Sequence, residues 1–372
     1  MKEFNSTGVC IPEMHYMADL SSKMEKIMNL IERGKYFTIN RPRQYGKTTA
    51  LFALCRILPK EYTCINISFE GIDNTGFESP QKFCQMFLRQ VSKSIKHTDE
   101  KFALLWLDEN VATFEMLSDK INELTLNRKV VLAIDEVDKA SNYEVFLYFL
   151  GAIRNLYLTR MNAPTFQSVI LASVHDVKNL KVKMAMDDMP IEDSSKWVGS
   201  PWNIAADFEV DMSFNPNEIA SMLIDYEDDR NIKMDTDLIA SEIYRFTSGY
   251  PYLVSRICLL IDTHLNQNWT IDGVRDAIKI MTTTEKNTLY NDLFKNLRRH
   301  KEIYEYMYDL LMLKRNTPYS LYSTKVEWSI LLGFVKMCAT GEITIANKIF
   351  ETILLKYFIT EESMAKKCIK QS

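Results

Sequence analysis

The chain has 372 residues, of which 47% are hydrophobic and 25% are charged, and its net charge is −4. These values are typical of a globular protein with a sizeable core and exclude a disordered or strongly basic chain. No apolar run approaches the about 20 residues that cross a membrane, and the first ten residues lack the apolar core of a signal peptide. We therefore expect a cytoplasmic protein with no membrane partner.

The cysteine pattern indicates neither a metal site nor a disulfide framework. The seven cysteines form no CxxC pair, and several lie in apolar runs, as Cys64 does in CINISF and Cys258 does in RICLLI. We expect them to be reduced core residues. The five histidines are scattered and no HExxH motif occurs, so a zinc hydrolase has no support. The cysteines are Cys10, Cys55, Cys64, Cys84, Cys258, Cys338 and Cys368.

The first predicted elements lead into the most informative stretch of the chain, residues 36–49. Apolar residues recur at helical spacing over residues 14–32 and predict a helix. The apolar run 36–40 predicts a buried strand, and a second helix is predicted to begin at Gly46. The turn between this strand and this helix lies in RPRQYGKTT, residues 41–49.

This turn has the composition of a phosphate-binding loop. A helix N-terminus offers free N–H groups and partial positive charge to a polyphosphate. Gly46 lets the backbone approach the phosphates, Lys47 reaches their oxygens, and the Thr48 hydroxyl can ligate Mg²⁺. The full pattern is G-x-x-x-x-G-K-[ST], and Arg41 stands in place of its first glycine.

A second motif follows downstream in KVVLAIDEVD, residues 129–138. A strand over residues 64–69 and helices from Ser79 and over residues 101–126 are predicted in between. The apolar run before Asp135 predicts a strand covered on both faces, and its end places Asp135 and Glu136 where parallel sheets bind ligands. Asp135 is predicted to hold the Mg²⁺ water shell and Glu136 to polarise the attacking water.

Two further strands complete the predicted sheet. Residues 143–160 predict a helix, residues 167–173 a buried strand, and residues 208–214, which alternate in polarity, a fifth strand. Five strands with intervening helices predict an α/β fold, the doubly wound parallel five-stranded sheet of a P-loop NTPase. We assign residues 1–214 to this ATPase core.

Beyond Phe214 the predicted strands stop. Residues 215–296 predict a small helical lid, which contains the sequence Ser-Gly-Tyr-Pro at 248–251. Residues 297–372 predict helices followed by a β-hairpin, which is the order of a winged helix. Over residues 286–372, 14 Lys and Arg stand against 9 Asp and Glu, so this region is basic while the rest of the chain is acidic.

Three sequences together resemble a known family: RPRQYGKTT, VVLAIDEVD and SGYPYLVSRIC, the last at residues 248–258. Over residues 7–359 the chain resembles the bacterial AAA-like ATPases of the STAND and origin-recognition lineage. Those proteins combine a P-loop domain, a helical lid with a G-x-P motif, and a C-terminal winged helix. The resemblance implies that ATP and Mg²⁺ are bound and that ATP is hydrolysed to ADP and phosphate.

The resemblance also implies roles for individual residues. Gly249 and Pro251 match the lid motif that rests on the adenine side of the nucleotide, and Arg256 matches a lid sensor of the γ-phosphate. Ser173 and His175 are candidates for the polar sensor at the tip of the strand after Walker B; the alternative is a strand that merely ends in polar residues. Lys47 and Glu136, with Ser173, form the predicted catalytic set, and Thr48 and Asp135 the metal set. The predicted nucleotide-binding loop comprises Arg41, Gln44, Tyr45, Gly46, Lys47, Thr48 and Thr49.

One departure from ring-forming relatives favours slow turnover. Residues 177–207, where those relatives place an arginine finger, contain no arginine. A trans-acting arginine is worth orders of magnitude in rate, so we expect a switch-like ATPase rather than a fast motor. In that hypothesis ATP draws the lid and the C-terminal domain toward the P-loop domain. Arg154 or Arg160 could replace the finger if a partner subunit presents one.

Three functional hypotheses remain from the sequence. The first is this nucleotide-controlled switch, with ATP or ADP as its ligand and a protein partner or a second copy as its target. The second is a DNA-binding regulator that acts through the winged helix and for which nucleotide is a secondary ligand; its competitor is a winged helix used only for packing. The third is a P-loop scaffold that no longer hydrolyses nucleotide, motivated by Arg41.

Overall fold

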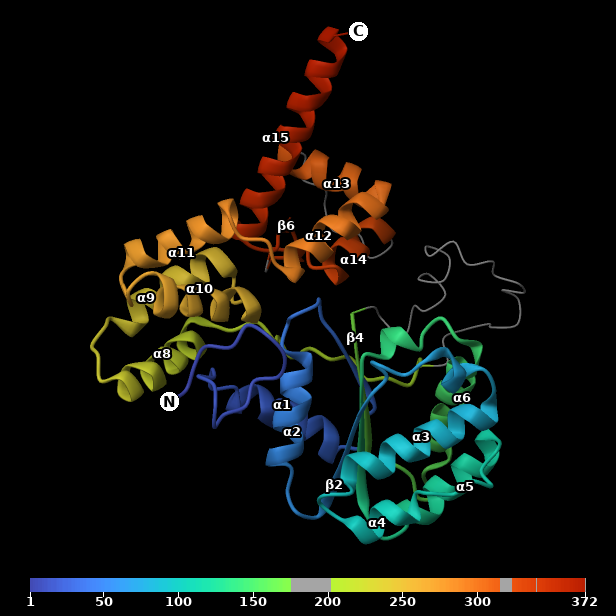
Figure 1. The fold of residues 1–372 in the computed structure, drawn as a ribbon. Coiled ribbons are helices and arrows are strands. Elements are labelled where there is room, and N and C mark those ends of the chain that lie inside the picture. The colour runs from blue at the N-terminus through green and yellow to red at the C-terminus, as the bar shows by residue number, and fades with distance from the viewer. Residues whose placement is uncertain (175–201, 315–322, 339, 372) are drawn as a thin grey trace. The chain divides into compact units, whose positions relative to one another are not determined.

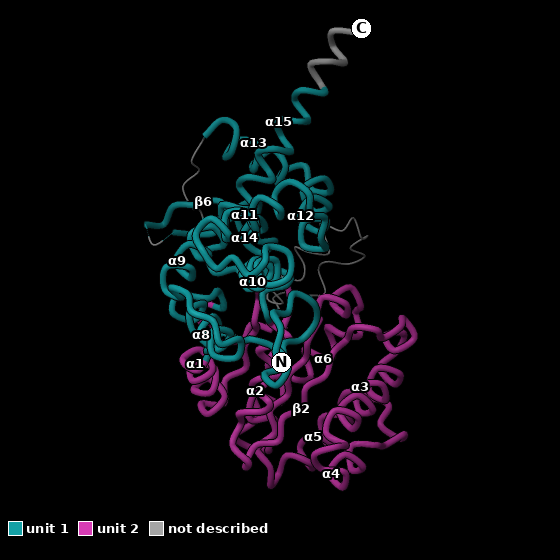
Figure 2. The backbone as a smooth tube through the Cα atoms, turned by 60° about the vertical axis from the view of Figure 1, so that its left-hand side comes forward, with its two compact units in different colours: residues 1–20, 42–46, 212–372 teal, residues 21–41, 47–211 magenta. Residues whose placement is uncertain are grey.

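The computed structural model describes residues 1–174, 202–314, 323–338 and 340–371. The chain divides into two compact units, shown in Figure 2. Unit 1 comprises residues 1–20, 42–46 and 212–372, and unit 2 comprises residues 21–41 and 47–211. No helix in these described ranges has both the length and the apolar character needed to span a membrane.

Unit 2 is built on a parallel four-stranded sheet with the order β1-β4-β3-β2. Its register brings polar strand ends to one edge: Asn40 pairs with Ser173, and Ser68 pairs with Asp135. Because all strands are parallel, these carboxyl ends share the edge at which such sheets bind ligands. The strands are β1 (Phe37–Asn40), β2 (Tyr62–Ser68), β3 (Lys129–Asp135) and β4 (Ser168–Ser173).

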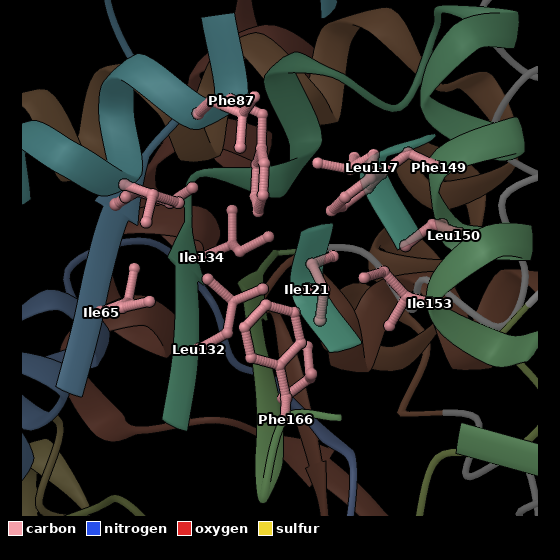
Figure 3. Close-up of a cluster of buried hydrophobic side chains, with 14 of the residues drawn as sticks. Ile65, Phe87, Leu117, Ile121, Leu132, Ile134, Phe149, Leu150, Ile153 and Phe166 are labelled. Carbon is pink, nitrogen blue, oxygen red and sulfur yellow. The ribbon is translucent and has the colours of Figure 1, made fainter. Parts of the chain in front are cut away.

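Helices cover both faces of this sheet, as a doubly wound fold requires (Figure 1). Alternate residues of the strands, such as Ile65, Leu132 and Ile134, face α3, α4, α5 and α6 and form a continuous apolar core (Figure 3). Helices α1 and α2 lie on the opposite face. The elements are α1 (Ser21–Glu32), α2 (Lys47–Ile57), η1 (Asn74–Phe77), α3 (Pro80–Ile95), α4 (Glu100–Leu105), α5 (Phe114–Thr125), η2 (Val137–Lys139) and α6 (Glu144–Thr159).

The predicted fifth strand, residues 208–214, is not formed. A single bridge pairs Ala206 with Phe37 beside β1, and the Phe208 ring stacks on Phe37 with 5.6 Å between ring centroids. The Arg41 side chain then donates from Nη2 to the Val210 carbonyl at 2.7 Å. The Val210 carbonyl is thus bonded to a side chain, and no ladder extends beyond the single bridge in the described part of residues 202–214.

The prediction that all cysteines are reduced is wrong for one pair. Cys55, near the end of α2, and Cys64, in the edge strand β2, form a disulfide with 5.4 Å between their Cα atoms. The two residues are only nine apart in sequence, and neither spacing nor burial pattern indicated that helix and strand would bring them together. Cys84 and Cys258 are buried free thiols, as expected, and burial raises the pKa of Cys84 to about 12.

Unit 1 contains the helices that follow Phe214. The first, α8, begins with a capping box in which Asn215 accepts from the Glu218 N–H and the Glu218 side chain accepts from the Asn215 N–H. The elements are α8 (Pro216–Arg230), α9 (Thr236–Thr247), α10 (Pro251–His264), α11 (Ile271–Thr283), α12 (Thr288–Arg299), α13 (Lys301–Met312), α14 (Thr324–Leu331), β5 (Val335–Met337), β6 (Ile343–Ile345) and α15 (Lys348–Gln371). Strands β5 and β6 pair antiparallel after α14, the order that the winged-helix prediction requires.

The first twenty residues pack against this helical unit. Phe4 and Tyr16 lie against Tyr226 of α8, with ring centroids 5.0 and 5.1 Å from its ring, and Trp269 adjoins the same cluster. The Tyr16 hydroxyl also donates to Asp229 at 2.5 Å. The predicted core domain, residues 1–214, includes this segment. The three-way domain division as a whole stays a prediction.

Candidate functional site

The predicted phosphate loop joins the carboxyl end of β1 to the first residue of α2, as a nucleotide loop should. Its central residues 42–46 group with unit 1, and the residues on either side, Arg41 and Lys47, belong to unit 2. Gln44 and Gly46 both have positive φ, of 57° and 77°. Left-handed residues turn successive N–H groups toward a common side and form the concave nests that bind anions.

Lys47 is buried at the start of α2, with 8% of its surface exposed. Its ammonium Nζ donates to the Arg41 carbonyl at 2.8 Å, across the base of the loop. A polyphosphate must compete with this carbonyl for the ammonium group, and its charge makes it the stronger acceptor. The arrangement places a desolvated cation where the sequence predicts the terminal phosphates.

A direct hydrogen bond joins the two sequence motifs. The Thr48 hydroxyl Oγ1 donates to Asp135 Oδ2 at 2.5 Å, although the residues are 87 positions apart. Asp135 is 4% exposed, and its second oxygen, Oδ1, accepts the Glu136 N–H at 2.9 Å. Mg²⁺ prefers oxygen ligands, and this hydroxyl and carboxylate fit the ion as a direct ligand and a holder of its water shell. When bound, the ion would supply neutralisation of phosphate charge.

Glu136 has an unusual backbone and a perturbed carboxyl group. Its φ and ψ of 53° and 40° are left-handed, a conformation that is costly for a residue with a side chain and is concentrated at functional sites. Burial, followed by repulsion from the Asp135 carboxylate, raises the pKa of Glu136 above the ordinary value, while the Lys47 ammonium lowers it. The carboxyl group is therefore a stronger base than an exposed glutamate.

Asn40 and Asp138, which had no predicted role, form hydrogen bonds at the carboxyl ends of the neighbouring strands β1 and β4. Ser173, the candidate sensor, is buried and donates from Oγ to Asn40 Oδ1 at 3.0 Å. Asp138 accepts the Val174 N–H at 2.6 Å and so ties the end of β4 to the Walker B turn. A polar residue at the end of an apolar strand could have singled out Asn40; nothing in the sequence marks Asp138. His175, the other candidate sensor, lies outside the described residues.

Arg41, which stands in place of the first glycine of the loop pattern, contacts the sheet and the segment that follows residue 202. Its guanidinium donates to the carbonyls of Asn40 and Val210, each at 2.7 Å, and lies over the Phe208 ring. Its own N–H donates to the Ser173 carbonyl at 3.2 Å. These contacts anchor the start of the loop to the sheet edge. The role of Arg41 in nucleotide binding stays a prediction.

The predicted lid residues lie in unit 1. Arg256 forms an ion pair with Glu285, with Nε 3.1 Å from both carboxylate oxygens, so a sensor role would require this pair to open. Pro251 begins α10, where its fixed φ suits the first turn. Arg160, one of the two candidate substitutes for an arginine finger, donates to the Gly34 carbonyl at 2.7 Å and lies over Tyr157.

Gly249 is required by close backbone contact. Its φ is +73°, and a Cβ atom there would lie 1.9 Å from the Phe214 carbonyl oxygen. We expect Gly249→Ala to lower the free energy of unfolding by about 2 kcal/mol or more through strain and overlap. Gly341→Ala is the matched control, because Gly341 has φ +80° with nothing within 4 Å of the added carbon. Equal shifts in denaturation midpoint for the two variants would contradict this expectation.

A parallel sheet with GKT after β1 and Asp-Glu at the end of β3 defines the fold class as that of the P-loop NTPases. The chain belongs to the AAA-like domain family, whose model matches residues 9–352. The resemblance to AAA-like ATPases inferred from the three motifs is thereby confirmed.

Comparison with solved structures finds similar chains, and the first described here has the same fold. A Walker-type ATPase of Pyrococcus abyssi is similar with a TM-score of 0.63 at 15% identity, over 94% of this chain and 99% of that one. The ORC2 protein of Aeropyrum pernix, in ADPNP and ADP complexes, is similar with a TM-score of 0.47 at 13% identity, over 97% of this chain and 98% of that one. A comparison with curated proteins finds no match.

Proposed function

We propose that this protein is a slow, Mg²⁺-dependent ATPase that acts as a nucleotide-controlled switch. The observation that carries the proposal is the hydrogen bond between Thr48 and Asp135, which joins the two nucleotide motifs at one edge of the sheet. Lys47, which is buried, directly precedes Thr48 in the first motif. Glu136, whose pKa is raised, directly follows Asp135 in the second motif. The family match to an AAA-like domain supports the nucleotide as the ligand.

Each side chain has a distinct task in this proposal. Lys47 exchanges the Arg41 carbonyl for phosphate oxygens and so attracts the terminal phosphates. Thr48 and Asp135 would hold Mg²⁺, which would neutralise phosphate charge. Glu136 accepts a proton from, or orients, the water that attacks the γ-phosphate, and Ser173 with Asn40 lies at the neighbouring strand ends as a phosphate sensor.

The absence of arginine from residues 177–207 supports slow turnover. Without a charge of that kind at the γ-phosphate, the ATP-bound form persists long enough to act as a signal. The test is steady-state ATP hydrolysis with Mg²⁺ by the full chain, together with ATP and ADP affinities from calorimetry. Tight binding with slow turnover supports the switch, binding without turnover supports a scaffold, and absence of binding overturns both.

A DNA-binding role is the second candidate, and the helix-then-hairpin order of residues 324–345 together with the basic charge of residues 286–372 favours it. If this region binds duplex DNA, affinity will fall steeply with salt, because phosphate contacts release counterions. We expect a gel shift at 50 mM salt that weakens on the order of 10- to 1,000-fold at 200 mM and is reduced by Lys325→Glu on α14. Lys279→Glu on α11 is the control, and no shift at low salt would end this candidate.

A further inference from the structure

Three polar contacts hold the centre of the phosphate loop within unit 1. The Tyr250 hydroxyl donates to the Arg43 carbonyl. The Arg43 side chain donates from Nη1 to Asp292 at 3.0 Å, and the Gln44 side chain donates from Nε2 to Thr288 Oγ1 at 2.9 Å. The last two acceptors lie in the first turns of α12.

These three contacts differ in burial and in whether the acceptor is a side chain or the backbone. The Arg43–Asp292 ion pair is exposed, and such pairs contribute little. The Gln44 contact is exposed as well. Tyr250 is 3% exposed, and its acceptor is a backbone carbonyl rather than a side chain. A buried hydroxyl that binds the backbone restrains the path of the loop itself.

The Tyr250 ring is fixed on several sides. It packs edge-on against Tyr45 of the loop, with 4.6 Å between centroids, and against Phe350 of α15, with 5.5 Å. The backbone before it is held as well, because the Gly249 N–H donates to Thr247 Oγ1 and the Phe214 N–H to the Gly249 carbonyl. Burial raises the pKa of Tyr250 well above its ordinary value, so the hydroxyl stays protonated and remains a donor at neutral pH.

This anchor determines where one loop amide points. The Arg43–Gln44 peptide is trans, so the Arg43 carbonyl and the Gln44 N–H point in opposite directions. With the carbonyl on Tyr250, the Gln44 N–H is turned away from Tyr250. The left-handed Gln44 then begins the run of N–H groups that leads to Gly46 and α2.

We propose that Tyr250 is a positioning residue, which orders the phosphate loop for nucleotide by holding the Arg43 carbonyl. The proposal deepens the proposed function and rests on it for the identity of the ligand. Tyr250 is the middle residue of the lid sequence Gly-Tyr-Pro, whose flanking Gly249 and Pro251 were the residues singled out from the sequence. The loop is therefore ordered before ATP binds, and the free energy of ATP binding is not reduced by the entropy lost on ordering the loop.

The test is Tyr250→Phe in the full chain, which keeps the ring and removes only the hydroxyl. Tyr252→Phe is the matched control, a buried tyrosine two residues further on, in the first turn of α10. We expect Tyr250→Phe to weaken ATP binding in calorimetry by about fivefold, the size of one neutral hydrogen bond, and Tyr252→Phe to change it by less than about twofold. KM should rise with kcat unchanged, because the anchor orders the loop rather than the attacking water.

Hydrogen exchange of the loop amides without nucleotide separates the two proposals. Faster exchange at residues 43–46 in Tyr250→Phe, but not in Tyr252→Phe, supports the positioning role even if the wild-type chain binds no ATP, an outcome that would sink only the proposed function. Equal exchange and equal ATP affinity in the two variants, with wild-type binding intact, would overturn the role of Tyr250.

Discussion

Glu136→Gln is expected to abolish most ATP hydrolysis while leaving ATP binding intact. Glutamine keeps the size of the side chain but cannot accept the proton of the attacking water, and loss of a general base costs about 10²- to 10⁴-fold in rate. Binding should persist or tighten, because a negative charge beside Asp135 is removed. The measurements are kcat for phosphate release and the ATP dissociation constant by calorimetry.

The pKa of Glu136 adds a pH signature to this experiment. Because burial and Asp135 raise this pKa, the carboxylate takes up its proton at a higher pH than an exposed glutamate would, and wild-type turnover should fall correspondingly early on the acid side. The pKa of Glu136 is higher in the folded state than in the unfolded state, so the free energy of unfolding decreases as the pH rises through this pKa. The amide variant should therefore not be less stable than wild type at pH 7.

The control for this substitution is Glu61→Gln. Glu61 is exposed and precedes β2, at the end of the sheet opposite to the strand ends that carry Asp135. The Glu61→Gln substitution should leave kcat unchanged. Unimpaired turnover in Glu136→Gln would remove Glu136 from the catalytic role, and equal losses in both variants would indicate a general loss of fold.

Lys47→Ala is expected to weaken ATP binding on the order of 100-fold. The buried ammonium makes charge-assisted hydrogen bonds, each about twice as strong as a neutral one, and more than one phosphate oxygen lies within its reach in the proposed complex. Alanine has the best helix propensity, so α2 should still begin at this position. Nucleotide affinity and the thermal midpoint should be measured on the same samples.

Lys60→Ala provides the comparison, because Lys60 is an exposed lysine beyond the end of α2. Its ATP affinity should match the wild type. If Lys47→Ala bound ATP as tightly as Lys60→Ala, the phosphate loop would not be the nucleotide site. The basic residues 286–372 would then become the region to study.

Local sequence predicted the four strands of the sheet and the two nucleotide motifs. Apolar runs predicted the inner strands β3 and β4, because strands buried on both faces are continuously apolar. The edge strand β2, in which alternate residues are buried, was predicted over residues 64–69. Gly46, Lys47 and Thr48 are adjacent in the chain, as are Asp135 and Glu136, and their chemistry depends on that adjacency. The parallel order then places both motifs at one edge of the sheet.

The helical period was less informative where a helix is interrupted. Residues 101–126 predicted a single helix, and the structure has two, α4 and α5. The Asp99 side chain caps the first by accepting the Phe102 N–H, and the Thr113 side chain caps the second by accepting the Met116 N–H. Asp and Thr occur both inside helices and at helix N-caps, and the surrounding packing decides which position they take. The sequence therefore did not show where the first helix ends and the second begins.

The sequence by itself predicted the class of site, since its motifs are short and their residues are neighbours in the chain. The tertiary structure alone decided which residues support that site. Asn40 meets Ser173 across 133 positions, and Tyr250 meets Arg43 across 207. It also joined Cys55 to Cys64 and replaced the fifth strand by a single bridge. The physical reason is that hydrogen bonds between distant segments depend on how helices and sheet pack, and periodicity carries no record of that packing.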